Sequence, residues 1–182
     1  MSPLFPALLL AFAAGGGAPP AGPPVSGPQV GDKVPGPFEP LNVTGPNAGE
    51  PCCLYCKFGH RPVAMVFART PTEPLARLIR KLDAACAEHP DLAGFVVFCN
   101  DDPGLPAALR KLADRDDHRH VVLAVTGPAG PDGYAVHKDA DVTVVLYTLL
   151  NVKANHAFRK GGFDDKAAEA VLADLPLILP AK

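Results

Sequence analysis

Apolar runs and helically spaced apolar residues alternate along the middle of the chain. Residues 61–68, 92–99 and 120–126 are almost continuously apolar, which is typical of central strands buried on both faces. Between these runs, residues 72–89 and 103–113 carry apolar side chains three and four positions apart, which predicts two amphipathic helices. Strands that alternate with helices indicate a parallel sheet core.

The pattern changes in the last third of the chain. Residues 141–151 and 152–158 form two strand-like stretches almost back to back, which predicts an antiparallel hairpin. Asp164 is a good N-cap for a last helix that should end before Pro176. With a short strand expected over residues 38–43, the fold class is α/β, a central mixed sheet flanked by helices.

Three segments resemble parts of one fold family. "VGDKVPGPFEPLNV" (30–43) is similar to the entry of redoxin domains, and "RPVAMVFART" (61–70) to their first core strand. "FRKGGFDDKAAEAVLADL" (158–175) resembles their last strand and helix. Together with the order of elements, residues 30–180 therefore resemble the thioredoxin-like fold in its redoxin and peroxiredoxin arrangement.

Two departures from that family change what the resemblance implies. In these families the reactive cysteine follows the first core strand, at the start of the next helix, where the helix dipole favours a thiolate. Here residues 70–73 read Thr-Pro-Thr-Glu, which resembles the peroxiredoxin Cys-Pro-Thr-Glu with Thr70 in place of the cysteine. The region that would hold the cis-proline of thioredoxins, residues 139–143, has no proline. Ordinary peroxidase chemistry is therefore not expected.

The main chemical candidate is the stretch "CCLYCKFGH", residues 52–60, which comes before the first core strand. Cys53 and Cys56 have Cys-x-x-Cys spacing, which permits a redox-active dithiol in an unusual position. In that hypothesis Cys53 is the nucleophile and Cys56 resolves the mixed disulfide. A disulfide that only pins the loop is an equally weighted alternative.

The same stretch can also be interpreted as a metal clip. Cys52, Cys53, Cys56 and His60 have ligand types and spacings that suit Zn or Cu(I). A fourth protein ligand would have to come from a histidine that folding brings near, namely His118, His120 or His156. A c-type haem attachment at Cys53–Lys57 is disfavoured, because no second axial ligand is evident.

The remaining cysteines and histidines are expected to be structural. Cys86 lies on the apolar stripe of its helix and Cys99 ends a buried strand, so both should be packed, inert thiols. The segment His118–His120 follows an acidic run and is expected to form a solvated turn.

Composition excludes some partners, and the N-terminus suggests a compartment. With 17 basic and 19 acidic residues and no Trp, nucleic acid is not an expected partner. Residues 1–18 are interpreted as a signal peptide, residues 19–37 as a Pro/Gly-rich linker and residues 38–182 as the folded domain. The protein should thus be exported to the periplasm or cell exterior, or tethered to a membrane by an uncleaved N-terminus.

Two functional hypotheses follow. The first is a thiol–disulfide oxidoreductase or electron-transfer protein that acts on protein thiols through Cys53 and Cys56. The second is a non-catalytic thioredoxin-like binding module, in which the cysteine cluster is a structural disulfide or a Zn or Cu clip. The sequence leaves the oligomeric state open, and it requires no cofactor in the first hypothesis.

Overall fold

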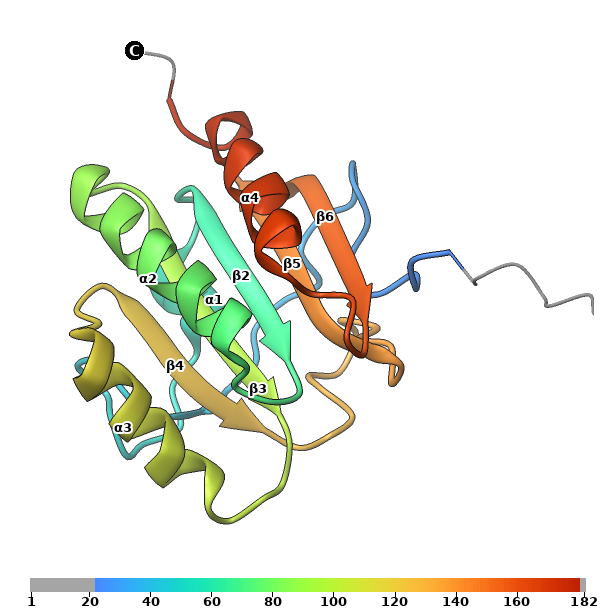
Figure 1. Ribbon diagram of the computed structural model, residues 1–182. Helices are drawn as coiled ribbons and strands as arrows, with labels where there is room; N and C mark the ends of the chain where they lie inside the picture. The colour runs from blue at the N-terminus through green and yellow to red at the C-terminus, as the bar shows by residue number, and fades with distance from the viewer. Residues whose placement is uncertain (1–21, 181–182) are drawn as a thin grey trace, which may run out of the picture.

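The computed structural model describes residues 22–180 and contains one six-stranded mixed sheet (Figure 1). The strand order is β1-β4-β3-β2-β5-β6, in which β2, β3 and β4 are parallel and the other neighbouring strands pair antiparallel. In chain order the elements are β1 (Leu41–Asn42), α1 (Leu54–Phe58), β2 (Val63–Ala68), α2 (Glu73–Glu88), β3 (Ala93–Cys99), α3 (Leu105–Asp116), β4 (Val121–Thr126), β5 (Ala140–Thr148), β6 (Asn151–Arg159), α4 (Asp165–Ala173) and the 3-10 helix η1 (Leu175–Leu177).

The sheet separates two apolar cores. On one face, α2, α3 and α4 pack over the sheet, as Figure 1 shows, and bury alternate residues of β2 such as Val66. The other face buries the intervening residues, such as Met65 and Phe67, against α1 and the β4–β5 connection. Every residue of β2 is therefore buried, which explains its continuously apolar sequence.

The expected strands and long helices are confirmed within a few residues at each end. Thr72 caps α2 and Asp164 caps α4, because each side chain accepts a hydrogen bond from a backbone N–H three residues further on. The short helix α1 was not expected. Its two buried residues, Leu54 and Phe58, are one helical turn apart, which is too short a repeat to show a helical period.

Residues 22–37 differ from the expected linker, because they lie against the second face of the sheet. The Ser26 hydroxyl hydrogen-bonds to Thr143 Oγ1 of β5 over 2.7 Å. Further along, Gly31 N–H donates to Val152 O and Val34 N–H to Leu150 O. This part of the linker is thus integral to the domain. Residues 1–21, with the expected signal peptide, lie outside the described residues.

The turn before β4 also differs from expectation. The side chain of His118 is only 1% exposed, and neither ring nitrogen has a hydrogen-bond partner. Nearby, the buried Asp83 carboxylate accepts hydrogen bonds from three consecutive backbone N–H groups, those of Arg119, His120 and Val121. These bonds satisfy donors that the turn would otherwise leave unpaired, so the turn is tied to α2. Within residues 22–180, no helix is both long and apolar enough to span a bilayer.

Candidate functional site

Cys53 and Cys56 form a disulfide across the first turn of α1. Cys53 is the N-cap of this helix, and its Sγ accepts a hydrogen bond from the Cys56 backbone N–H at 3.0 Å. One helical turn brings positions three apart to the same side, which is why the Cys-x-x-Cys spacing suits this bond. Cys56 is exposed and Cys53 is half-buried, so the pair can be reached from solvent.

The helix that carries the disulfide is anchored by two apolar residues. Leu54 is fully buried, and the Phe58 ring stacks on that of Phe95 in β3 with centroids 5.7 Å apart. Both side chains belong to the core on the face opposite α2. The pair is therefore located on the other side of the sheet from α2, the helix at whose start the resemblance would place the reactive cysteine.

Polar contacts hold the loop on either side of the disulfide. The Cys52 backbone N–H donates to Pro40 O, and Lys57 Nζ donates to Asn47 Oδ1 at 3.2 Å. Cys52 is half-buried and is not part of a disulfide. The exposed His60 accepts a hydrogen bond on its carbonyl oxygen from Leu149 N–H. The loop is thus tied to the β1 region at its start and to the β5–β6 turn at its end.

The metal clip is not assembled in this oxidised form. Residues 22–180 contain no group of three or more His, Cys, Asp or Glu side chains placed to hold an ion. The sulfurs of Cys53 and Cys56 are bonded to each other. Of the histidines considered as a fourth ligand, His156 instead contacts Asp174 at 2.9 Å. Zinc or copper binding by Cys52, Cys53, Cys56 and His60 stays a prediction about the reduced protein.

The other two cysteines are buried, as expected. Cys86 is 5% exposed and Cys99 is 2% exposed. Burial raises the pKa of each thiol to about 11, because the charged thiolate would lose its hydration. Neither thiol is therefore an accessible nucleophile at neutral pH.

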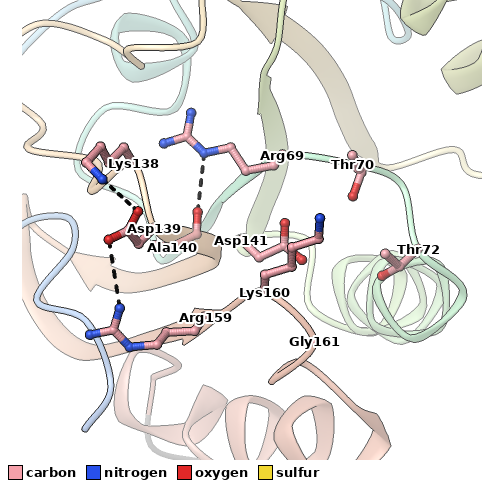
Figure 2. A pocket seen from close by; sticks show the side chains of 10 residues that line it. All are labelled: Arg69, Thr70, Thr72, Lys138, Asp139, Ala140, Asp141, Arg159, Lys160 and Gly161. Atoms are coloured by element: carbon pink, nitrogen blue, oxygen red, sulfur yellow. Dashed lines mark hydrogen bonds and ion pairs between the residues drawn. The ribbon is translucent and has the colours of Figure 1, made fainter. Parts of the chain in front are cut away.

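The corner between β2 and α2 holds an open cavity of about 790 Å³ (Figure 2). Thr70 lines it at the position that the sequence aligns with the reactive cysteine, and Lys138, Asp139 and Lys160 line it as well. The ten residues around this cavity include no cysteine. The peptide bonds of residues 22–180 are all trans, so the start of β5 also lacks a cis-proline. The thiol chemistry that the resemblance implies for this corner therefore has no cysteine here to carry it out.

Arg69 holds the same corner together. Its guanidinium donates hydrogen bonds to the carbonyl oxygens of Ala140 and Cys99, each at 3.2 Å, and to that of His137 at 3.1 Å. It also contacts the carbonyl oxygen of Pro128. These acceptors belong to the ends of β3 and β5 and to the β4–β5 connection. The Arg69 guanidinium is therefore engaged with backbone carbonyl groups, which argues against a role in binding an anion. Sequence reasoning missed it because its partners lie 30 to 71 residues away.

Comparisons with known proteins agree with this architecture. The chain is similar to a thiol peroxidase from Chromobacterium violaceum, with 19% identity, a TM-score of 0.57, and coverage of 84% of this chain and 91% of that one. It is similar to a putative thiol:disulfide interchange protein DsbE from Chlorobium tepidum, with 21% identity, a TM-score of 0.55, and coverage of 81% and 98%. A putative protein disulfide isomerase from Bacteroides thetaiotaomicron gives 12% identity, a TM-score of 0.61, and coverage of 85% and 93%.

These likenesses show the fold, a thioredoxin-like mixed sheet flanked by helices. The chain lacks a cysteine at the position that this fold uses most often. No protein-family model and no curated protein sequence matches the chain. Because the identities are low, the comparisons extend to the fold, and the function is argued from the site.

Proposed function

We propose that this protein carries out thiol–disulfide exchange on protein thiols through Cys53 and Cys56. The observation that carries the proposal is the solvent-accessible disulfide at the start of α1, with Cys53 Sγ accepting the Cys56 N–H. A hydrogen bond to sulfur stabilises a thiolate over a thiol once the disulfide is reduced, which favours Cys53 as the attacking group. Proteins of similar fold that are named for peroxidase or disulfide-interchange activity add support.

The exchange needs only the two sulfurs and a substrate. In the reduced protein the Cys53 thiolate attacks a substrate disulfide, forms a mixed disulfide and releases one substrate thiolate, which takes a proton from water. The Cys56 thiolate then attacks Cys53 Sγ, re-forms the Cys53–Cys56 bond and releases the second substrate thiol. The reverse sequence oxidises a substrate dithiol.

Export belongs to the same proposal. Disulfides persist in oxidising compartments and are rare where glutathione and thioredoxin keep thiols reduced. A short apolar run, residues 4–14, followed by small residues is typical of a signal peptide. N-terminal sequencing of the protein recovered from an exporting host tests this part, and a chain that still begins at Met1 in the cytosol would contradict it.

The decisive measurement is a redox titration of the Cys53–Cys56 pair against glutathione, with disulfide mapping by mass spectrometry. An exchange-active pair should equilibrate at a potential between about −120 and −270 mV, the range of known oxidoreductases. The variant Cys56→Ser should accumulate a mixed disulfide at Cys53 with an unfolded substrate whose cysteine is activated as a mixed disulfide, and the activating thiol is the leaving group. The matched control is Cys52→Ser, which removes the adjacent thiol and should leave turnover intact.

One outcome would support the structural alternative instead, and another would change the roles of the two cysteines. A potential below about −300 mV, together with a large loss of thermal stability on reduction, would identify the bond as a staple of a binding module. Trapping at Cys56 in Cys53→Ser, with none at Cys53 in Cys56→Ser, would reverse the assigned roles. Zinc and copper analysis of the reduced protein in the same preparation tests the metal clip.

A further inference from the structure

The turn between β5 and β6 is built from two residues that rarely adopt its conformation. Leu149 and Leu150 have φ angles of 51° and 61°, so both lie in the left-handed region. A two-residue hairpin with both φ angles positive is a type I′ turn, for which Asn-Gly is strongly preferred. Bulky leucines are disfavoured there, because Cβ approaches the backbone carbonyl. Backbone strain of this kind indicates that the side chains serve a purpose the turn itself does not need.

Internal packing accounts for only one of the two leucines. Leu150 is half-buried and packs against the core on the α1 face of the sheet. Leu149 is 64% exposed and is one of the five exposed large apolar residues in the described part of the chain. An asparagine at this position would relieve the strain and would not expose apolar surface.

Leu149 lines a groove of about 440 Å³ at the end of the molecule where β5 meets β6. Leu177 of η1, 55% exposed, also lines it. Pro62, Leu179 and Pro180 add apolar surface to the lining. The strained leucine therefore belongs to a groove formed by four segments that are far apart in the sequence, 60–62, 91, 148–149 and 177–180. Its apolar lining comes from three of them, and His60, Arg61, Asp91 and Thr148 are the polar residues of the lining.

The groove is directly connected to the Cys53–Cys56 loop. Leu149 N–H donates a hydrogen bond to His60 O at 3.0 Å, and His60 itself lines the groove. His60 follows Cys56 by four residues, which an extended chain spans in at most about 14 Å. A protein segment whose cysteine reacts at Cys56 or Cys53 can thus extend as far as the groove.

We propose that this groove binds an apolar side chain of an extended substrate segment, about four to six residues from the cysteine that reacts. The inference rests on the proposed thiol–disulfide exchange and adds to it a rule for substrate choice. Leu149 and Leu177 make the contact, and the backbone strain at Leu149 is retained because its side chain is needed there. A single extended segment is the occupant that suits this groove, because the groove has room for only a few side chains.

The test compares two peptides with the reduced full chain. Each carries one cysteine activated as a mixed disulfide with thionitrobenzoate, and they differ only in having Leu or Asn five residues from that cysteine. Attack by Cys53 releases the coloured thionitrobenzoate anion and forms the peptide–Cys53 disulfide. Cys56 then closes the Cys53–Cys56 bond and frees the peptide thiol. The ratio of kcat/KM for the two peptides isolates docking from the reactivity of the dithiol.

Wild-type protein should prefer the leucine peptide by about tenfold, the effect of burying much of one leucine side chain. Leu149→Asn and Leu177→Asn should each bring the ratio close to one. The control is Val30→Asn, which changes an equally exposed apolar residue outside the groove and should keep the ratio. Leu149→Asn should also melt at the same or a higher temperature than wild type, because asparagine tolerates the left-handed conformation.

Three results would overturn the docking proposal. These are no preference in wild type, an unchanged preference in Leu149→Asn, and a dimer in sedimentation that Leu149→Asn dissociates, since the groove would then be an interface between two copies. Failure of the proposed function has a different signature. In that case wild-type protein releases no thionitrobenzoate from either peptide, nor from the symmetric disulfide of thionitrobenzoate used without a peptide.

Discussion

The five cysteines of this chain differ in chemistry because their surroundings differ. Burial raises the pKa of Cys86 and Cys99 to about 11, and the core around them shields both thiols from solvent. Cys53 and Cys56 are bonded to each other on an accessible helix turn. Cys52, beside them, is a half-buried thiol. At the scale of a residue, burial therefore separates structural thiols from candidates for exchange.

His118 predicts a specific dependence of stability on pH. Burial lowers its pKa below the ordinary value of 6.5, with Asp83 and Asp116 opposing the shift and Arg80 and Arg115 adding to it. Between the folded and unfolded pKa values the unfolded chain binds more protons. The free energy of unfolding should therefore decrease as the pH falls through about 6.5, by at most about 1.4 kcal/mol per pH unit.

Urea unfolding of wild type and His118→Leu between pH 7.5 and 5.5 measures this effect. The variant should show a shallower decrease, because its side chain has no proton to gain. His60→Gln serves as the control, since His60 is exposed and outside the core. An identical slope in wild type and His118→Leu would mean that another group causes the loss of stability.

At the scale of elements, Arg69 joins the ends of three strands and the connection that precedes β5. Arg69→Lys keeps the charge but cannot reproduce a guanidinium that donates to several carbonyl oxygens at once. We expect a loss of about 1–3 kcal/mol in the free energy of unfolding, because part-buried carbonyls lose their donors. Amide hydrogen exchange should increase over residues 127–139.

Arg77→Lys is the matched control for that experiment. Arg77 makes an exposed ion pair with Asp165, and the two side chains are 40% and 66% exposed, respectively. Replacing Arg77 should therefore change the free energy of unfolding by less than about 0.5 kcal/mol. Equal effects of the two substitutions would show that Arg69 does not organise the corner. Increased exchange confined to α2 would point to a different role.

At the scale of the whole molecule, residues 22–37 complete the second face of the sheet. A chain that begins at Phe38 should melt about 10 °C or more below one that begins at Gly22. The shorter chain loses the Ser26–Thr143 bond and the backbone bonds to Leu150 and Val152, and it exposes apolar surface of β5 and β6. Calorimetry of both proteins measures the difference, and equal melting temperatures would restore the interpretation of this segment as a tether.

Much of the fold is determined by the sequence alone. The apolar strands 61–68, 92–99 and 120–126 and the two amphipathic helices between them are recognisable because burial imposes a period on nearby residues. The closing hairpin follows from two strand-like stretches with no room for a crossover. The order of these elements also puts the Cys-x-x-Cys pair before the first core strand, away from the usual position, and the structure agrees.

Only the tertiary structure decided how distant segments meet. Residues 22–37 look like a linker because Pro and Gly carry no periodic signal, yet Ser26 bonds to Thr143, 117 positions away. The burial of His118, the carbonyl contacts of Arg69 and the groove beside Leu149 likewise depend on partners from other elements. Local patterns report which side of an element is buried, whereas the identity of what buries it is a property of the folded chain.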